Sequence, residues 1–425
     1  MYQVIYDYPT VMYFKALRDL VEIGDKVAPR GKLISELRPA CFEFGNPYNR
    51  VTFLRGRRIN PFFQIAESLW ILSGRADVEF LSKFNENMKQ FSDDGVWFNA
   101  PYGERMRLWN KNSLHGIIIN PIDQLVDVYR KLSEDKDTRQ AVIVLSNPMF
   151  DNSKYTINEK GKDISCNLVI TFKIRHNKLN MTVFNRSNDL HWGVFGANLC
   201  QFSTIQECLM NWLKVSKYPE LQMGTYNQIT DSLHIYLDDY GSKITNVVLK
   251  EYKNKSVGES NVIWEFPNEP RMSFGVKQFD DFLNLFWYVI NPQLMNDEVM
   301  QDDNKREEVF GKDGMFVDSY KKGQIDDYWY FAIQSMVVYR LVKLGKLPEA
   351  LEYMTHMESC QWKVSMLYFL KKFVIKVIHV EPDEYLTAQR VSNLYLHNAK
   401  QLLSHMTNMN ETSVSALEEY LRVEE

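Results

Sequence analysis

The sequence has few cysteines, and nothing in their spacing makes them structural. Only five occur among 425 residues, and no two form a Cys-x-x-Cys pair or a spacing typical of disulfide-rich proteins. This excludes a small disulfide-stabilised secreted scaffold. We therefore expect reduced thiols in a cytosolic setting, which leaves one of them free to act as a nucleophile.

Long apolar runs and an excess of positive charge are also missing. No run approaches the ~18 apolar residues of a membrane helix, and the N-terminus lacks the basic and apolar regions of a secretory signal. The formal net charge is −4, whereas a nucleic-acid-binding protein usually has a basic face. No cluster of side chains has metal-ligand spacing. We therefore expect a cytoplasmic protein (host cytoplasm if a phage encodes it) with no membrane, nucleic-acid or metal partner.

What the sequence does contain is typical of a globular protein with a large core. Hydrophobic residues make up 45% and aromatic residues 13%. Short alternating strands and helices are mixed up to about residue 280. Beyond it, apolar residues recur at helical spacing, most clearly in 324–345, 348–359 and 361–378. The pattern predicts an α+β domain over residues 1–280 and an all-helical extension over residues 281–425.

A β-hairpin is predicted around the polar segment HNK at 176–178, because apolar and polar residues alternate on both sides of it. If Arg175 pairs with Leu179, Cys166 falls opposite Asn188. A slip of one residue would change this arrangement.

In this register Arg186 is the diagonal neighbour of Cys166 on one face of the hairpin. A guanidinium beside a thiol lowers the pKa of the thiol and enlarges the fraction of nucleophilic thiolate. Alternatively, Cys166 fills space at a strand end and Arg186 is a surface cation. The polar cluster RSND at 186–189 favours the functional interpretation.

A second candidate is a carboxylate on the apolar face of a helix. Residues 60–74, NPFFQIAESLWILSG, carry Pro in the first turn and Gly past the end. Glu67 has Phe63, Trp70 and Ile71 at helical spacing. Desolvation there should raise its pKa toward neutrality, as a general acid or base requires. The alternative is a glutamate whose charge is paired at the edge of the core.

Seven sequence blocks, in order over roughly residues 28–280, resemble the thymidylate synthase superfamily, which includes the phage-type pyrimidine hydroxymethylases. The spacing from Cys166 to the arginine of the RSND cluster agrees with the family pattern. The resemblance implies an α+β fold, a thymidylate synthase-like mixed β-sheet packed with helices. The blocks are PRGKLISEL (29–37), AESLWILSGRADVEFL (66–81), APYGERMR (100–107), DTRQAVIVLSNP (137–148), Cys166, RSNDLHWGVFGAN (186–198) and DSLHIY (231–236).

The resemblance also implies a reaction. In this family a cysteine adds to C6 of a pyrimidine deoxynucleoside monophosphate, and C5 then receives a one-carbon unit from 5,10-methylenetetrahydrofolate. Hydride from the folate completes a methyl group, or water completes a hydroxymethyl group. Cys166 matches the nucleophile and Glu67 the catalytic glutamate. Tyr102 matches the tyrosine that places the proton-transfer network, and Asp189 the folate-side aspartate.

Phosphate-binding residues are implied in the same way. Arg186 and Ser187 match phosphate contacts, since Arg suits bidentate phosphate recognition, and Arg30 lies in the N-terminal phosphate segment. Arg139 matches an arginine lent to the second subunit, which implies a homodimer with shared active sites. Gln140 stands where the family usually has another arginine, so phosphate binding should be weaker or rearranged.

Other residues match the family positions that contact the base and the sugar of the nucleotide. His234 and Tyr236 align with groups near the pyrimidine and the ribose 3′-hydroxyl. Asn198 aligns with the base-reading position, where an amide favours uracil and an Asp would suit cytosine, so the expected substrate is dUMP. The segment GVFGAN at 193–198 holds one residue more than the family spacing. Asn198 could also be the N-cap of the following helix.

Two departures bear on the product. Residues 86–95 lack the tryptophan that methylating members use as a shield, and Trp97 comes too late to align. The chain ends in ALEEYLRVEE after a helical extension, where methylating members have a short apolar tail. Both changes would admit water, which slightly favours hydroxymethylation. Reductive methylation of dUMP to dTMP and hydroxymethylation of dCMP remain the alternatives.

Two other protein classes are compatible with parts of the pattern. A non-catalytic nucleotide-binding scaffold is disfavoured because Cys166 and Glu67 are both present. A hydrolase using Cys166 with His191 or His234 is disfavoured because no oxyanion motif is recognisable.

Overall fold

The computed structural model describes residues 1–6, 8–57, 59–109, 120–151, 162–252, 266–311, 325–378, 385–406 and 411–423. The chain forms two compact units. The first comprises residues 1–57 and 63–261, and the second comprises residues 58–62 and 262–425. The division into domains at residue 280 that the sequence suggests stays a prediction.

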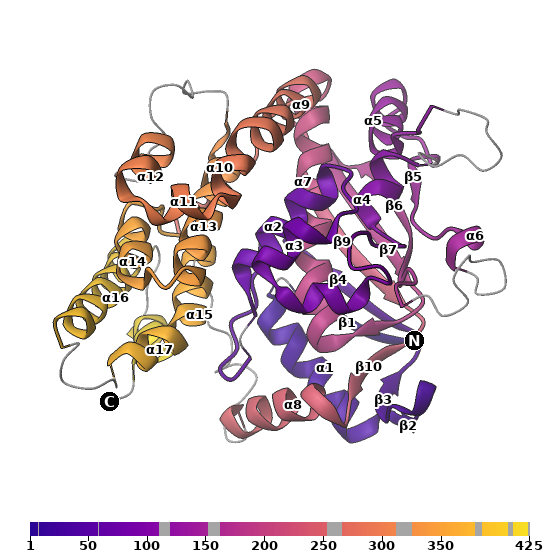
Figure 1. Ribbon diagram of the computed structural model, residues 1–425. Helices are drawn as coiled ribbons and strands as arrows, with labels where there is room; N and C mark the ends of the chain where they lie inside the picture. Colours follow the sequence, from indigo (N-terminus) through magenta and orange to yellow (C-terminus); the bar gives the residue numbers. More distant parts are fainter. Residues whose placement is uncertain are drawn as a thin grey trace. The chain divides into compact units, whose positions relative to one another are not determined.

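The first unit is built on two β-sheets (Figure 1). The six-stranded sheet has the order β1 (Tyr2–Tyr6), β4 (Ala40–Phe44), β9 (Gln222–Thr230), β7 (Lys178–Asn185), β6 (Asn167–Arg175) and β5 (Val142–Val144). The four-stranded sheet has the order β2 (Asp25–Val27), β3 (Ile34–Leu37), β10 (Leu233–Tyr236) and β8 (Asn188–Asp189). Both sheets contain parallel and antiparallel pairs. The expected α+β fold with a mixed sheet is confirmed.

Helices surround these sheets. Among them α2 carries Glu67. Gly74, the glycine predicted to follow the end of this helix, has a positive φ of 70°. The helices of the first unit are α1 (Pro9–Ile23), α2 (Pro61–Leu72, whose first two residues group with the second unit), α3 (Val78–Phe84), α4 (Tyr102–Arg107), α5 (Gln124–Glu134), α6 (Pro148–Asp151), a π-helix (Leu190–Asn198), α7 (Leu199–Ser216), α8 (Asp239–Tyr252) and two short 3₁₀ turns (Pro29–Gly31 and Glu86–Phe91).

The two faces of the six-stranded sheet differ in burial. On one face, against which α7 packs, a row of paired residues crosses all six strands and is at most 1% exposed: Val4, Phe42, Gln228, Val183, Ile170 and Ile143. On the other face, the neighbouring row includes the apolar residues Ile229, Phe184, Val169 and Val144. Phe184 and Val144 there are 37% and 38% exposed. The sheet therefore has one fully covered face and one that is only partly covered.

The hairpin β6–β7 forms, but in a different register from the predicted one. Its turn consists of two residues, His176 and Asn177, with φ of 53° and 55° as a type I′ turn requires. Arg175 therefore pairs with Lys178 instead of Leu179.

A β-bulge between Asn167 and Val169 shifts the register by a further residue. As a result the backbone N–H of Arg186 donates to the carbonyl of Cys166 at 3.0 Å. Arg186 is thus directly opposite Cys166, and the predicted pairing of Cys166 with Asn188 is wrong.

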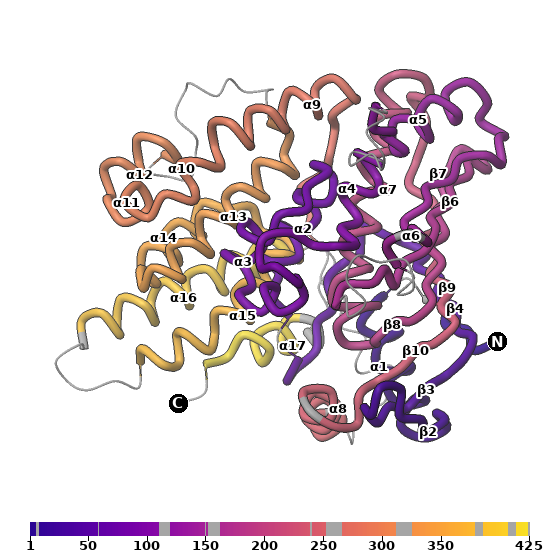
Figure 2. The backbone as a smooth tube through the Cα atoms, turned by 45° about the vertical axis from the view of Figure 1, so that its right-hand side comes forward, coloured from indigo at the N-terminus to yellow at the C-terminus, as the bar shows by residue number. Residues whose placement is uncertain are grey.

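Within its described residues the second unit is helical, as expected, and its helices α14, α15 and α16 lie side by side (Figure 2). The helix predicted over 361–378 coincides with α15 (Gln361–Ile378). The other helices are α9 (Val276–Leu285), a π-helix (Phe286–Ile290), α10 (Asn291–Met295), α11 (Asp297–Gln301), α12 (Asp303–Phe310), α13 (Asp327–Lys343), α14 (Leu347–Thr355), α16 (Tyr385–His405) and α17 (Glu411–Leu421).

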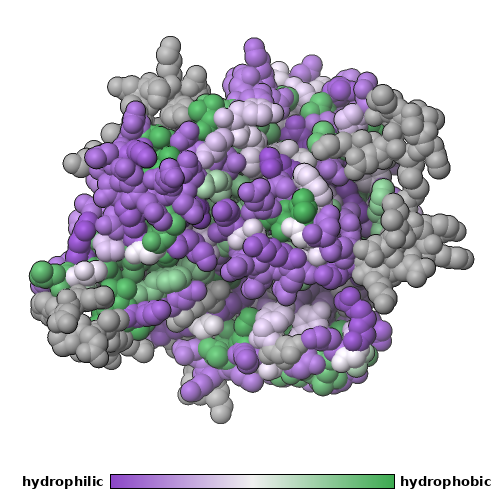
Figure 3. Space-filling view, viewed as in Figure 1, coloured by the Kyte–Doolittle hydropathy of each residue, from purple (hydrophilic) through white to green (hydrophobic). Residues whose placement is uncertain are grey.

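The surface drawn in Figure 3 is mostly hydrophilic, and its hydrophobic residues gather in a few places. Within the described parts of the chain, none of the helices combines the length and apolarity that a membrane crossing needs. The same described residues contain no group of three or more His, Cys, Asp or Glu side chains arranged to hold a metal ion.

Candidate active site

Cys166 directly precedes β6, with the Arg186 side chain folded against it. The guanidinium donates from Nε to the carbonyl of Ser165 at 2.8 Å and from Nη2 to the carbonyl of Ile164 at 3.1 Å. Nη2 is also 3.5 Å from the sulfur of Cys166. The two carbonyls hold the guanidinium in place beside the thiol. The predicted meeting of these two side chains is confirmed, although it arises from a different register.

The predicted low pKa of the Cys166 thiol is wrong. Burial raises the pKa of Cys166, and the nearby Asp163 carboxylate raises it further. Arg186 and Arg30 act in the opposite direction but do not outweigh the loss of solvation. The thiol is therefore mainly protonated at neutral pH, and the two arginines limit how far its pKa rises.

We predict that Arg186→Gln slows alkylation of Cys166 by iodoacetamide about tenfold at pH 8, because removing the cation raises the pKa of the thiol and lowers its thiolate fraction. The measurement is the rate of mass addition at Cys166. Arg175→Gln, at the other end of β6, is the matched control and should react like the wild type. Equal rates for the wild type and Arg186→Gln would show that the guanidinium has no electrostatic effect on the sulfur.

Tyr102 holds the backbone at Cys166. Its hydroxyl oxygen, from the first turn of α4, accepts the backbone N–H groups of Cys166 and Asn167, each at 3.3 Å. Burial raises the pKa of Tyr102, so the hydroxyl stays protonated and its own hydrogen remains available to donate.

Glu67 is buried on α2, with 8% of its surface exposed. Burial raises its pKa to about 7, and a hydrogen bond with the Gln201 side chain acts in the opposite direction. Oε2 of Glu67 and Oε1 of Gln201 have no hydrogen-bond partner among the described residues. The predicted effect of burial on this carboxyl is confirmed, and two buried acceptor oxygens are available there to bind a water molecule.

Asp189 is the N-cap of the π-helix Leu190–Asn198. Its carboxylate accepts the backbone N–H groups of His191 at 2.6 Å and Trp192 at 2.9 Å, and the hydroxyl of Tyr240 at 2.5 Å. A π-helix turn holds one residue more than an α-helix turn. The segment GVFGAN, which holds one residue more than the family spacing, lies within this π-helix.

Asn198 lies at the junction of the π-helix and α7. Its φ and ψ are helical and its side chain makes no cap hydrogen bond, so the N-cap alternative is wrong. The side chain, 7% exposed, instead bonds to two other amides. Nδ2 donates to Oδ1 of Asn188 at 3.2 Å and to Oδ1 of Asn167 at 3.3 Å.

The remaining residues predicted to bind the nucleotide lie on β10 and the turns around it. His234 pairs with Asp189 across the strands and packs its ring edge-on against Tyr236, with centroids 5.3 Å apart. Arg30 has a left-handed φ of 53° and its charge acts on both Tyr236 and Cys166. Ser187 follows directly after Arg186 and is partly exposed.

Arg139 is not part of this group within one chain. It is exposed in the turn between α5 and β5, and Arg175 at the far end of β6 donates to the neighbouring Asp137 carbonyl at 3.2 Å. Cys166 is at the other end of β6, nine residues and roughly 30 Å from Arg175 at the rise of a β-strand.

His191, the candidate partner of Cys166 in a hydrolase, has both ring nitrogens engaged elsewhere. Nδ1 is 2.6 Å from the hydroxyl of Tyr13, and Nε2 is 3.1 Å from that of Thr245. Burial lowers its pKa to about 4, so this imidazole is neutral and structural.

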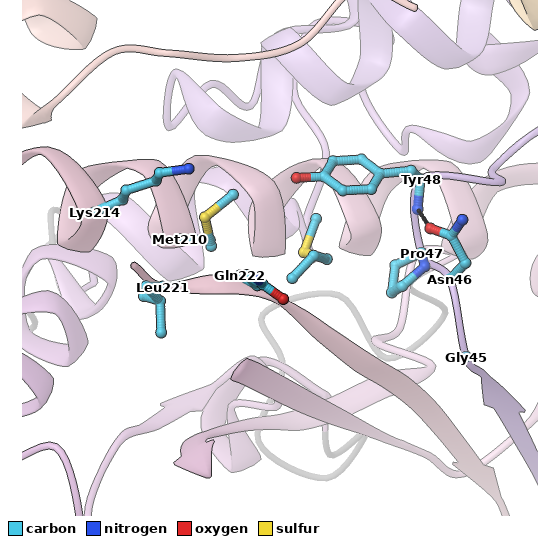
Figure 4. A pocket seen from close by; sticks show the side chains of 9 residues that line it. Gly45, Asn46, Pro47, Tyr48, Met210, Lys214, Leu221 and Gln222 are labelled. Atoms are coloured by element: carbon cyan, nitrogen blue, oxygen red, sulfur yellow. Dashed lines mark hydrogen bonds between the residues drawn. The ribbon is translucent and has the colours of Figure 1, made fainter. Parts of the chain in front are cut away.

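A surface hollow of about 340 Å³ lies elsewhere in the first unit, between the loop at 45–48 and the last turns of α7 (Figure 4). Tyr48, Met210 and Lys214 line it. Met210 is twelve residues beyond Asn198 on α7, which corresponds to roughly 18 Å of helix. None of the predicted site residues lines this hollow.

Comparison with known proteins agrees with the geometry around Cys166. The sequence model described as thymidylate synthase matches residues 12–268. The chain belongs to the thymidylate synthase family. It is 48% identical over 370 residues to a deoxyuridylate hydroxymethyltransferase of Bacillus phage SP01, covering 86% of this chain and 92% of that protein.

Two further relatives match over a smaller part of the chain. A deoxyuridylate hydroxymethyltransferase of Pseudomonas phage M6 is 36% identical over 199 residues, covering 47% of this chain and 51% of the relative. A putative thymidylate synthase of Methanococcoides burtonii is 31% identical over 151 residues, covering 36% and 58%. The alignment with the SP01 protein is longer than the first unit, so it includes part of the helical second unit.

Several side chains at this thymidylate synthase-like site were missed in the sequence. Gln201 contacts Glu67, and it could have been found because it follows Asn198 by three residues and so shares a helix face with it. Asn167 directly follows Cys166. Asn188 and Gln228 are joined to Asn198 only through tertiary packing, so no sequence spacing points to them.

Proposed function

We propose that this chain is a deoxyuridylate hydroxymethyltransferase, which transfers a one-carbon unit to C5 of dUMP and completes it with water. Two findings support the proposal: membership of the thymidylate synthase family and 48% identity to a phage enzyme of that name. The observation that carries the chemistry is the sulfur of Cys166 held 3.5 Å from the Arg186 guanidinium.

Cys166 is the proposed nucleophile. Its sulfur bonds to C6 of the pyrimidine, the thiol proton leaves, and the electron pair of the C5–C6 double bond moves toward C5 and O4. Arg186 and Arg30 favour the thiolate, and Tyr102 fixes the backbone behind the sulfur. Release of the sulfur at the end of the reaction restores the C5–C6 double bond.

Glu67 is the proposed general acid and base. Because its pKa is about 7, both protonation states are populated near neutral pH, so the carboxylate can take a proton and return it. It would remove the proton from C5, pass it to the departing tetrahydrofolate, and later take the proton of the water whose oxygen bonds to the new carbon. Gln201, with its unpaired acceptor oxygen next to Glu67, would orient that water.

The product choice is supported by the surroundings of Trp97. This side chain is 54% exposed in a turn whose backbone N–H groups bond to Asp94. It therefore does not form the apolar shield that would keep water from the reacting carbon.

Methylenetetrahydrofolate would supply the one-carbon unit. The residues around Asp189 fit such a flat, hydrogen-bonding heterocycle, because the carboxylate bonds to the Trp192 backbone and the Tyr240 hydroxyl, and both of these aromatic side chains are 44% exposed. Asp189 would hold the folate by hydrogen bonding, with Trp192 as a stacking surface.

The nucleotide phosphate would be bound by Arg186, Ser187 and Arg30, and the sugar and base by Tyr236, His234 and Asn198. Arg139 would reach the phosphate of a second copy of the chain, since it lies far from Cys166 in its own. The partly covered sheet face, with Phe184 and Val144 more than one third exposed, supports a homodimer that covers this face. A reducing cytoplasm would keep Cys166 free.

The proposal is tested by incubating the purified protein with dUMP and methylenetetrahydrofolate and identifying the nucleotide product by mass. We expect a gain of CH₂O, the mass of a hydroxymethyl group. A gain of CH₂ would show reductive methylation instead, and an unchanged nucleotide would contradict the proposed function.

A further inference from the structure

Five amide side chains form a buried cluster in the first unit. They come from four strands and a helix junction, and none is more than 7% exposed: Asn167 on β6, Asn185 on β7, Asn188 on β8, Gln228 on β9 and Asn198 at the start of α7. A buried amide is costly unless its donor and acceptor groups are bonded. The cluster therefore has to be explained by its hydrogen bonds.

Gln228 is the most unusual member, because it is the only polar residue in the fully buried row of the six-stranded sheet. Its paired neighbours are Val183 and Phe42, and all three are 0% exposed. Nε2 of Gln228 donates to the backbone carbonyl of Val194 at 3.5 Å, and Oε1 accepts from Nδ2 of Asn188 at 2.9 Å.

This arrangement fixes the direction of the next amide. The Val194 carbonyl can only accept, so Gln228 turns its NH₂ toward that carbonyl and its oxygen toward Asn188. Asn188 must then present its own NH₂ to Gln228, which leaves its oxygen facing Asn198. Gly193 allows this position, since a Cβ there would lie 2.0 Å from Oδ1 of Asn188.

Asn198 receives its orientation from the same chain of bonds. Both hydrogens of its NH₂ are used, one by Asn188 at 3.2 Å and one by Asn167 at 3.3 Å. Its oxygen has only a long contact of 3.5 Å with Nδ2 of Asn167. The pair Asn167 and Asn198 therefore offers one available acceptor, Oδ1 of Asn198, next to one available donor, Nδ2 of Asn167.

Taking Asn198 as the base-reading residue of the proposed function, we propose that Asn167 is a second uracil contact and that Asn188 and Gln228 are positioning residues that hold both amides in this orientation. Building on the proposed function, Oδ1 of Asn198 accepts from N3–H of the base and Nδ2 of Asn167 donates to O4. Cytosine presents the opposite pattern, an acceptor at N3 and a donor at the 4-amino group. Both contacts would then be mismatched, and a polar site rejects such a ligand strongly.

The test measures equilibrium binding of dUMP and dCMP to the full chain. We expect the wild type to prefer dUMP by roughly 100-fold or more. Gln228→Leu removes the anchoring amide and should reduce that preference at least about tenfold. Gln228→Glu keeps the acceptor oxygen that Asn188 needs and should largely retain it. Asn167→Asp replaces the donor facing O4 with an acceptor and should weaken dUMP binding about 100-fold while leaving dCMP binding less affected.

The matched control is Gln206→Leu. Gln206 is another fully buried amide, on α7, and its NH₂ bonds to backbone carbonyls at Leu179, Gly224 and Thr225. This variant should lower the melting temperature without changing the dUMP preference. The inference is overturned if Gln228→Leu keeps the wild-type preference, if Gln206→Leu loses as much of it, or if the wild type prefers dCMP. Because the readout is binding, the absence of turnover would contradict the proposed function and still leave this test decisive.

Discussion

Replacing Cys166 with alanine is expected to lower the rate of product formation from dUMP by about four orders of magnitude or more. The proposed reaction begins with a bond between the Cys166 sulfur and C6, and alanine offers no nucleophile in its place. Cys166 is partly exposed at a strand end, and its sulfur makes only long contacts, 3.9 Å to the Ile164 carbonyl and 3.5 Å to Arg186, among the described residues. The fold should therefore survive the substitution.

The measurement is the turnover number by product mass, together with the thermal midpoint of unfolding. Cys208→Ala is the matched control: this cysteine is 2% exposed within α7, so its loss should lower stability and leave turnover close to that of the wild type. If Cys166→Ala retained even one hundredth of the wild-type rate, another group would have to supply the nucleophile.

Replacing Glu67 with glutamine should reduce turnover by roughly 10²–10⁴-fold and at the same time stabilise the protein at alkaline pH. The first effect follows because an amide can neither accept nor return the proton. The second follows from the pKa of Glu67, which burial raises from an ordinary value near 4.5 to about 7.

The sign of the stability effect is fixed by proton binding. Between pH 4.5 and 7 the folded chain keeps the Glu67 proton while the unfolded chain has lost it, so stability falls as the pH rises through this range. Glutamine does not titrate. Glu67→Gln should therefore match the wild type near pH 4.5 and exceed it by about 3 kcal/mol at pH 8.

Glu207→Gln provides the contrast. Glu207 is 1% exposed and pairs with Arg50 at 2.6 Å, so its neutralisation leaves a buried guanidinium without a counter-charge and should destabilise the protein. Denaturant unfolding at pH 5 and pH 8 measures both variants. A Glu67→Gln protein that is less stable than the wild type at pH 8 would show that the carboxylate is paired after all.

The fold was largely predictable because its signals are local. The helical spacing of 361–378 and the apolar face around Glu67 depend on residues a few positions apart, and both elements form as expected. The sequence blocks around Cys166 and Asp189 gave the candidate site residues because the family pattern preserves their order.

The pairing register of the β6–β7 hairpin was not predictable in this way, because the backbone conformation of one or two residues decides it. HNK allowed a turn of two or three residues, and the left-handed His176 and Asn177 selected the shorter one. The bulge before Val169 then restored the contact between Cys166 and Arg186.

The direction of the Cys166 pKa shift and the amide cluster could not be predicted for another reason. Both depend on which side chains the tertiary fold buries. The sign of the Cys166 pKa shift depends on how far the fold removes the sulfur from water, which an arginine nearby in the sequence does not reveal. Gln228 meets Asn188 only because β8 and β9 bring distant segments together.

The most direct test of covalent catalysis by Cys166 follows the hydrogen at C5 of dUMP. If Cys166 activates the ring, wild-type protein with methylenetetrahydrofolate should release tritium to water from dUMP labelled at C5, and Cys166→Ser should release none above background. Release by Cys166→Ser at the wild-type rate would contradict covalent activation by this sulfur, and with it the catalytic roles proposed for Arg186 and Tyr102.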